Sequence, residues 1–569
     1  MARIILLLAC TAVTLATIAA SSIVEHKFNV GNFPIQRLCQ EYVQIAVNGS
    51  LPGPAIEVRE GDSLVIHVCN ESPYNITLHW HGVFQRLSGW ADGPAYVTQC
   101  PILPGNSYTY RFAITEQEGT LWWHAHAHIT MLRATVHGAI IIRPKFRGYP
   151  FKSPYMEIPL ILGEWWNENL AVVENNILTR GGAPSGSLSN AFTINGQPGH
   201  LYPCSTDGMF KLNVVSGKTY LLRIVNAAVV YQLFFKIAQH TFTVVAIDAS
   251  YTVPYVTDVI VIAPGQTTDV LFEANQPNGD YYMAAQPYSD SPIVRFPNGT
   301  ATGLVHYVGS TSSTGLMPVL PSPKDTSTAF KFYTSFTSLR TGPFWRPCPE
   351  TVDEKMFITI GGALLPCGPV ANCSSPVGPR YQLSASMNNV SYLPPSTLSL
   401  LEAFYYGVDG IYTDDFPNNP PVVFDYTNPK ESLNFDLLTP ERGTRVKRLK
   451  YNSVVEIVFQ NTALLAVDSH PMHLHGFDFY VLAQGFGNYD PIKGPPMFNL
   501  VNPQKRSTLA VPTGGWAVIR FRANNPGVWF VHCHTDLHIT LGLDMAFLVE
   551  NGQTKSSTLP SPPPDYPRC

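Results

Sequence analysis

The sequence predicts an all-β protein built from three consecutive Greek-key β-barrel or β-sandwich domains. The chain contains 42 glycines, 49 prolines and 12% aromatic residues, but only 13% charged residues, about half the usual share. This composition favours short strands and turns over long charged helices. Hydrophobic residues alternate with polar ones at period two, and the chain repeats itself weakly three times. A length of 569 residues is sufficient for three such domains.

The charge balance excludes one large class of function. Lysine and arginine total 36, aspartate and glutamate total 40, and the net charge is −4. A protein that neutralises phosphates needs a basic excess, so we expect no nucleic-acid partner. No acidic or low-complexity block is long enough to indicate disorder.

The N-terminus has the pattern of a signal peptide over residues 1–22. Arg3 precedes an apolar run of 17 residues, 4–20, and small residues at 19–22 suit cleavage. An uncleaved membrane anchor is the alternative, because the run is only slightly shorter than a membrane span. No other window is apolar enough to cross a bilayer. The sequence therefore predicts a secreted, extracellular protein with no membrane attachment after cleavage.

Glycosylation signals and cysteines agree with secretion. Six N-x-S/T triplets are potential glycosylation sites, at Asn48, Asn70, Asn75, Asn298, Asn372 and Asn389. Of the ten cysteines, Cys10 leaves with the signal peptide and Cys533 belongs to the candidate metal site below. The remaining even number permits disulfides, but their connectivity does not follow from the residues alone.

The threefold repeat divides the chain. The clearest part of each copy has a turn, an alternating strand, a glycine turn and an aromatic strand, over 104–126, 264–286 and 512–534. A looser match precedes each copy and ends at Asn70, Asn226 and Asn461. With a polar linker at 310–326, the predicted domains are 23–146, 147–325 and 326–569.

Alignment of the copies on their turn glycines separates the outer domains from the middle one. In the first copy, His124 and His126 stand five and seven residues after the glycine. In the third copy, His532 and His534 stand at the same two places. The middle copy has alanine and glutamine at these places. The middle domain is therefore expected to space the outer two or to shape a substrate surface.

Ten of the 17 histidines fall into four clusters, which are His79/His81, His124/His126, His470/His473/His475 and His532/His534/His538. On a strand, residues i and i+2 share a face, so each H-x-H pair can offer two imidazoles to one site. Four such pairs supply eight nitrogens. Ordinary buried histidines do not explain why the pairs occur only in the outer repeats.

Cys533 lies between His532 and His534, and on an extended chain its side chain points to the opposite face. This indicates two metal sites, one on each side of a single strand. Cys533 with His470 and His538 has the Cys-His₂ composition of a blue-copper site, and a site of eight imidazoles suits a copper cluster. Structural zinc, the alternative, takes four ligands and leaves most of these histidines unexplained.

These motifs resemble those of the multicopper oxidases over nearly the whole mature chain. The matching motifs are H-W-H-G, W-W-H-A-H, H-P-M-H-L-H-G and H-C-H-T-D-L-H, and stretches such as SGWADGPAYVTQCPI and NPGVWFVHCH are similar to plant laccases. The resemblance implies three cupredoxin domains and four coppers, with the type 1 copper in domain three, none in domain two, and a trinuclear cluster between domains one and three. It implies type 1 ligands His470, Cys533 and His538, type 2 ligands His79 and His473, and type 3 triads His81/His124/His534 and His126/His475/His532.

One segment departs from the family pattern. It reads His124-Ala-His126-Ala-His128 before the LRAT stretch. Counting back from LRAT selects His126 and His128, whereas counting forward from Gly119 selects His124 and His126. We prefer the second choice, because a buried strand specifies its own register and the third copy agrees.

Three further residues have expected roles near the metal sites. Leu543 stands at the family's axial position, where ascorbate oxidases have methionine; leucine cannot bind copper, which should raise the type 1 potential and favours a laccase. Asp92 matches an acidic position near the trinuclear cluster, with a role in proton delivery, or is a turn aspartate before glycine. Asp536 either orients an imidazole or is simply solvated.

The resemblance also implies two disulfides, Cys100–Cys569 and Cys39–Cys204. Cys367 and Cys373 are close enough in sequence to pair, and the states of Cys69 and Cys348 stay open.

The sequence as a whole indicates a plant-type laccase of the apoplast or cell wall, expected to be a monomer. Phenolic substrates, such as lignin precursors, would give up one electron at a time near His470 or His538. Cys533 would pass the electron through His532 or His534, and O₂ would be reduced to water. An ascorbate oxidase or a metal-ion oxidase with the same coppers is the alternative. A non-catalytic cell-wall glycoprotein is a more distant one, and such a protein should have lost ligands.

Overall fold

The computed structural model describes residues 21–145, 148–179, 188–205, 208–297, 299–311, 314–367, 381–465 and 468–569. Residues 1–20 of the predicted signal peptide, Asn298, Asn372 and Cys373 lie outside these ranges. Within them, no helix is both long and apolar enough to span a membrane.

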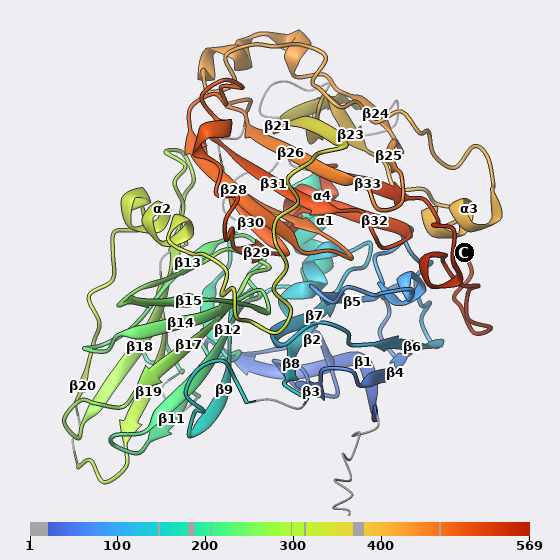
Figure 1. Cartoon of the computed structure of the whole chain (residues 1–569). Helices are drawn as coiled ribbons and strands as arrows, with labels where there is room; N and C mark the ends of the chain where they lie inside the picture. Colours follow the sequence, from blue (N-terminus) through green and yellow to red (C-terminus); the bar gives the residue numbers. More distant parts are fainter. Residues whose placement is uncertain are drawn as a thin grey trace, which may run out of the picture.

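The predicted all-β fold is confirmed, with six sheets that form three pairs along the chain (Figure 1). In the first pair, one sheet has the order β2 (Gln40–Val47), β1 (Ile23–Arg37), β4 (Ser63–Asn70) and β6 (Ser107–Ala113). The other has the order β3 (Ile56–Arg59), β8 (His137–Arg143), β7 (Gly119–Ala125) and β5 (Leu78–His81). Alternate residues of β4 are buried, as its period-two pattern predicts.

The middle pair has a larger sheet with the order β10 (Ala191–Ile194), β9 (Met156–Trp165), β12 (Thr219–Asn226), β17 (Thr267–Glu273), β14 (Phe242–Ile247) and β15 (Ser250–Thr257). Its second sheet has the order β11 (Phe210–Val214), β19 (Ala301–Tyr307), β18 (Asp280–Tyr288), β13 (Gln232–Ile237) and β16 (Ile260–Ile262), with β20 (Gly315–Leu316) beside β18. Helix α2 (Thr326–Thr334) packs Ala329 and Phe332 into the same core.

The third pair has a sheet with the order β24 (Glu441–Gly443), β23 (Val390–Tyr392), β22 (Tyr381–Met387), β21 (Glu354–Pro366), β26 (Val454–Asn461), β31 (Gly515–Arg522), β28 (Phe479–Phe486) and β29 (Lys505–Arg506). Its partner sheet has the order β25 (Val446–Leu449), β33 (Asp544–Val549), β32 (Gly527–Cys533), β27 (His470–Leu474) and β30 (Thr508–Val511).

The three units repeat one topology, which explains the repeat in the sequence. The strands that end the three copies occupy equivalent places in their sheets. Strand β7 lies between β8 and β5, β18 lies between β19 and β13, and β32 lies between β33 and β27. The strands β4, β12 and β26 each pair in parallel with the first long strand of their unit. The alignment of copies by their turn glycines therefore aligns equivalent strands.

The first and third units share one hydrophobic core. The core around β4 and β7 also contains Phe530 of β32, Leu548 of β33 and Leu400 of helix α3 (Leu400–Tyr406). Helix α1 (Leu170–Thr179), from the middle segment of the chain, adds Val173 to the same core. In Figure 1 the blue first unit and the orange-red third unit lie directly against each other. This shared core fixes the outer units relative to each other where the clustered histidines lie.

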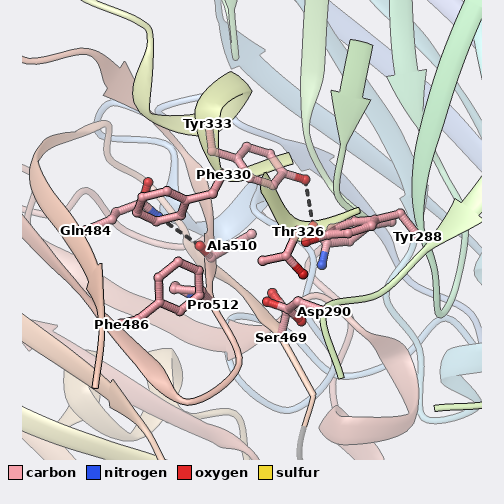
Figure 2. A pocket seen from close by; sticks show the side chains of 11 residues that line it. Tyr288, Asp290, Thr326, Phe330, Tyr333, Ser469, Gln484, Phe486, Ala510 and Pro512 are labelled. Atoms are coloured by element: carbon pink, nitrogen blue, oxygen red, sulfur yellow. Dashed lines mark hydrogen bonds between the residues drawn. The ribbon is translucent and has the colours of Figure 1, made fainter. Parts of the chain in front are cut away.

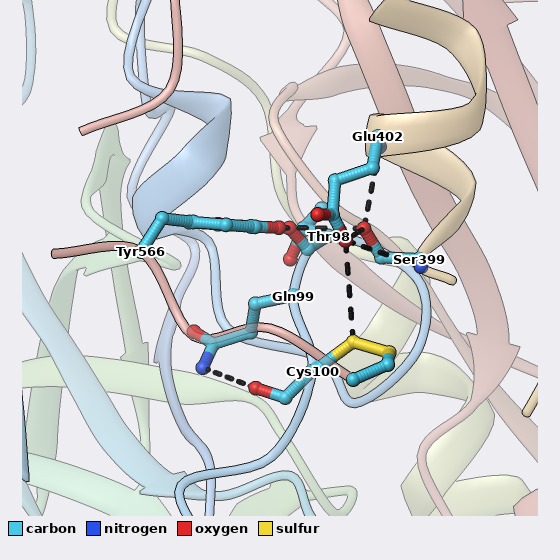
Figure 3. Close-up of a disulfide and its surroundings, with 7 residues drawn as sticks. Thr98, Gln99, Cys100, Ser399, Glu402 and Tyr566 are labelled. Carbon is cyan, nitrogen blue, oxygen red and sulfur yellow. Dashed lines mark hydrogen bonds between the residues drawn. A yellow bond between two sulfur atoms is a disulfide. The ribbon is translucent and has the colours of Figure 1, made fainter. Parts of the chain in front are cut away.

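The C-terminal tail ties the third unit to the first. Both disulfides that the resemblance implies are present, Cys39–Cys204 and Cys100–Cys569. Beside Cys100, the Tyr566 hydroxyl donates to the Thr98 carbonyl oxygen (Figure 3). Cys367 is disulfide-bonded, and Cys69 and Cys348 are free thiols.

Candidate metal centre

Two equivalent strands of the outer units position four of the clustered histidines. Strand β7 carries His124, with His126 one residue past its end, and β32 carries His532, with His534 just past Cys533. Both strands start at a glycine, Gly119 or Gly527, with φ of 129° or 141°, a conformation that other residues rarely adopt. The common start fixes the register in which the histidines emerge at the junction of the two units.

The neighbouring strands add the other four imidazoles. In β5, His79 pairs with His124 of β7, and in β27, His473 pairs with His532 of β32. All eight side chains are buried, and they are His79, His81, His124, His126, His473, His475, His532 and His534.

The eight imidazoles form groups whose nitrogens lie within 4.8 Å of one another. Two groups are His81/His124/His534 and His126/His475/His532, and a third joins His79 and His473 to His81. The His475 and His126 Nε2 atoms lie 3.1 and 3.4 Å from Nε2 of His532. The structure thus brings together the two triads and the pair that the sequence analysis assigned, with every triad drawing on both outer units.

The ambiguous segment is resolved by burial. His124 and His126 both lie in these groups, whereas the side chain of His128 is exposed. The register counted from Gly119 therefore describes the structure, and the register counted from LRAT does not.

Hydrogen bonds and burial prepare several of these imidazoles to bind a metal. The Nδ1 atoms of His79 and His473 donate to the backbone oxygens of Asp92 and Ser507, each at 2.8 Å, which leaves their Nε2 atoms without a partner among the described residues. Burial and neighbouring imidazoles lower the pKa of His473 to about 3, and lower that of His124 well below its usual value. Neutral imidazoles with a free, inward Nε2 fit a metal cluster.

Asp92 holds two of these rings. Its side chain is fully buried, with Oδ2 2.9 Å from Nδ1 of His475 and Oδ1 3.4 Å from Nδ1 of His79. It follows the short 3₁₀ helix η1 (Gly89–Ala91) and precedes Gly93 in a turn. Asp92 is therefore both an aspartate before glycine in a turn and an acidic residue in contact with the imidazoles.

Arg133 is a residue of the centre that the sequence analysis did not single out. It lies on the 3₁₀ helix η2 (Thr130–Ala134), its guanidinium is fully buried, and its Nη1 contacts Nδ1 of His534 and lies 2.7 Å from Oδ1 of Asp536. Asp536 is therefore ion-paired, and the alternative of a solvated side chain is wrong. The signal in the sequence is that this arginine stands in an otherwise apolar stretch. Arginines are rarely buried without a partner, so an arginine in such a stretch indicates a buried partner.

On the other side of β32, Cys533 meets the remaining two histidines. Its Sγ lies 3.3 Å from Nδ1 of His538 and 3.6 Å from Nδ1 of His470. His538 lies on the short helix α4 (Asp536–Thr540) and is the least buried of the three. Burial raises the pKa of the Cys533 thiol, so it becomes a thiolate only beside a cation such as a bound metal.

Leu543 occupies the apolar surroundings of this thiol. It is fully buried in the same core cluster as Cys533, and its backbone oxygen accepts from the Cys533 amide at 3.2 Å. A leucine side chain has no ligand atom, so the site offers three protein ligands.

A small pocket lies next to Ser469, the neighbour of His470 in the sequence. It lies between the middle and third units, where Asp290 and Phe330 face Ser469 and Phe486 (Figure 2). Its volume is about 10 Å³, which is room for about one water molecule. In this structure the pocket is therefore too small for an organic molecule.

A buried glutamate near Arg133 gives the protein a pH-dependent stability. Glu174 of α1 accepts from the Met131 amide at 3.0 Å, and burial raises its pKa from 4.5 to about 7. The folded protein therefore holds this proton to higher pH than the unfolded chain does, and stability falls as the pH rises from about 4.5 to about 7. We expect Glu174→Gln to remove this loss, a gain of up to about 3 kcal/mol above pH 7.

Thermal unfolding of the two proteins at pH 4 and pH 8 tests this expectation. The variant should melt at a higher temperature at pH 8 and at the same temperature at pH 4. Glu168→Gln, an exposed position just before α1, is the matched control and should change neither value. An equal midpoint for Glu174→Gln and wild type at pH 8 contradicts the expected loss.

The fold and the two centres define a class of protein. Three Greek-key units, a buried Cys-His₂ group on one side of a strand and eight buried imidazoles on the other are the arrangement of a copper-dependent oxidase. Family models described as multicopper oxidase match residues 29–146, 156–310 and 415–553. The chain belongs to the multicopper oxidase family, and the two curated relatives described next are plant laccases.

The relatives match the chain over its whole length. It is 58% identical to Laccase-7 of Arabidopsis thaliana, over 99% of both proteins. It is 53% identical to Laccase-6 of Oryza sativa subsp. japonica, over 97% of both. Among solved structures, a laccase from Botrytis aclada superposes with a TM-score of 0.75 at 26% identity, covering 95% of this chain and 89% of that one. Fet3p, described as a multicopper oxidase that functions in iron import, shares the fold, with a TM-score of 0.72 at 22% identity over 96% and 98% of the two chains.

Proposed function

We propose that the chain acts as a laccase that oxidises phenols in one-electron steps and reduces O₂ to water with the electrons. The observation that carries this proposal is the place of Cys533. Its side chain belongs to one group of ligands, and the residues on either side of it, His532 and His534, belong to the other. A continuous run of covalent bonds thus connects a site that accepts one electron to a site that can collect four.

Four coppers fit the ligands, with His470, Cys533 and His538 for type 1 and His79 and His473 for type 2. The two triads, each with three nitrogens within 4.8 Å, fit the type 3 pair. Bound copper would supply the one-electron redox chemistry at the first group and the reduction of O₂ at the second.

The protein's own residues hold this chemistry in place. His538 is half-buried whereas His470 and Cys533 are buried, so the phenol approaches the edge of the His538 ring. Asp92 orients His475 and His79 and is placed to hold a proton beside the site where O₂ is reduced. Arg133 fixes His534 through its ring and its backbone oxygen.

We further propose that the protein acts outside the cell, in the apoplast, on lignin precursors or related phenols, as a monomer. The predicted signal peptide and the disulfides support secretion, because disulfides persist in oxidising compartments. Glycans fit the exposed Asn48 and Asn75. They do not fit Asn70, whose buried amide donates to the backbone oxygens of Tyr74 and Ile102.

Oxygen uptake by the copper-loaded protein tests the activity. We expect uptake with a methoxyphenol, in a ratio of one O₂ to four phenols, and none from the copper-free protein. Uptake with ascorbate alone, or with Fe²⁺ alone, would assign the protein to one of the other oxidase activities. No uptake from a protein shown to hold four coppers would contradict the proposal.

The axial position gives a quantitative test of the type 1 site. A methionine sulfur at position 543 can bind copper weakly and stabilises its oxidised form. We therefore expect Leu543→Met to lower the type 1 potential by about 60–120 mV, which corresponds to one to two factors of ten in the equilibrium constant. Redox titration of the blue absorption band measures this value. Leu541→Met, two residues away in the same turn, is the control and should leave the potential unchanged. An unchanged potential in Leu543→Met would show that residue 543 does not face the copper.

A further inference from the structure

A cavity of about 590 Å³ lies apart from the Cys533 site. Its walls include the loop after His81, with Phe84 and Arg86, the loop after His475, with Phe477 and Asp478, and the segment 344–350 before β21. Three other segments contribute Glu116, Lys505, Arg522 and Asn524. None of the three type 1 residues lines it. The volume lies in the range of cavities that hold a small organic molecule.

Arg86 is a cation on this wall without an anionic partner. Its Nη1 donates to Oδ1 of Asn524 at 2.8 Å, and no carboxylate among the described residues lies within ion-pair distance. The two nearby carboxylates already have partners, Glu116 with Arg346 at 3.4 Å and Asp478 with Lys505 at 3.5 Å. A half-buried guanidinium of this kind is suited to bind a carboxylate through two parallel hydrogen bonds.

Aromatic side chains also line the cavity, together with the charged Glu116, Arg346, Glu350, Lys505 and Arg522. Phe84, Phe344, Phe477 and Tyr480 line the cavity, and the guanidinium of Arg86 lies 5.3 Å from the centre of the Phe84 ring. Rings at these positions favour a flat, aromatic ligand over an aliphatic or a sugar acid.

Asp478 supplies a hydrogen-bond acceptor that lacks a donor. Its side chain is 9% exposed, and its Oδ1 atom is buried with no hydrogen-bond partner among the described residues. Asp478 also lines the cavity, so its carboxylate is the acceptor that a ligand hydroxyl can reach.

We propose that this cavity is a second ligand site, which binds a phenolic acid. The carboxylate pairs with Arg86, the ring lies against Phe84 and Phe477, and the phenolic hydroxyl donates to the Asp478 carboxylate. The site binds its ligand without oxidising it, and the proposal does not depend on the reaction at the type 1 copper.

Calorimetric titration with 4-hydroxycinnamate tests the site in the holoenzyme. The coppers are first reduced with dithionite and oxygen is excluded, so that the phenol cannot be oxidised. We expect Arg86→Gln to weaken binding at least about tenfold, because a charge-assisted pair is lost. The methyl ester, which has the same shape without the charge, should bind wild type as weakly as the acid binds Arg86→Gln. Asp478→Asn should weaken binding of 4-hydroxycinnamate but not of cinnamate, which has no hydroxyl.

Matched variants separate the cavity from other effects. Arg111→Gln removes an exposed arginine that pairs with Asp565 outside the cavity and should leave binding unchanged. Arg522→Gln removes an exposed cation of the same wall and should weaken binding about threefold; it serves if Arg86→Gln does not fold, as judged by copper content and thermal midpoint. Unchanged binding in Arg86→Gln, no binding by wild type, or equal binding of galacturonate would each overturn the proposal. Binding that persists in every variant belongs to the type 1 site and also overturns it.

Discussion

Replacing Cys533 with serine is expected to abolish phenol oxidation, with a loss of about 10³-fold or more. The side chain of Cys533 belongs to the same group as His470 and His538, and its backbone joins it directly to two imidazoles of the other group. A serine hydroxyl is a poor ligand for this type of site and cannot provide the thiolate path for the electron. The variant should therefore lose the blue absorption band and retain only the coppers of the cluster.

Steady-state oxygen uptake and copper analysis measure this effect together. The chain offers a matched control in Cys69, a free, half-buried thiol on β4. Cys69→Ser should keep the blue band, the copper content and the rate. A Cys533→Ser protein that still oxidises phenols at more than a hundredth of the wild-type rate would rule out Cys533 as the path of the electron.

Replacing Asp92 with asparagine is expected to slow the reduction of O₂ by about 10- to 100-fold while leaving the type 1 site intact. The Asp92 carboxylate contacts both His475 and His79. An asparagine can accept from one of them only by turning its NH₂ group toward the other, and it carries no negative charge. Both the orientation of the rings and the local store of a proton are lost.

The readout for Asp92→Asn separates the two sites. The blue band and the rate at which a phenol reduces it under argon should be unchanged, whereas the reoxidation rate with O₂ should fall. The spectroscopic signature of the type 2 copper should shift, because His79 is one of its proposed ligands. Asp258→Asn, an exposed aspartate paired with Lys236, is the control. If reoxidation by O₂ is as fast in Asp92→Asn as in wild type, Asp92 has no role at the cluster.

Much of the fold was predictable because the local patterns are strong. Strands such as β4 bury every second residue, and this period-two pattern is visible in the sequence. The alignment of Gly119 with Gly527 also predicted that His124 and His126, and not His128, lie at the site. A strand with a fixed start turns alternate side chains to one face, so the glycine determines which histidines point inward. The groups of histidines followed from this register and from the resemblance to the family.

Contacts between distant segments were not predictable. Arg133 and His534 are 401 residues apart, and nothing near either residue in the sequence names the other. The same holds for the ion pair of Arg133 with Asp536, which a single sequence cannot distinguish from a solvated aspartate. The cavity beside Arg86 combines residues from six separate segments of the chain. Such features depend on how the units dock through their shared core, which period and spacing do not encode.

The cluster combines histidines from distant parts of the chain, and this separation determines when the cluster can form during synthesis. His126 and His532, which face each other across the cluster, are 406 residues apart. At about 5–20 residues per second, ribosomes make the second roughly 20–80 s after the first. For most of that interval the four histidines of the nascent first unit have no counterparts, because His473 and His475 follow only shortly before β32 is made. A cluster with all eight imidazoles therefore cannot form until His534 has been made, close to the end of synthesis.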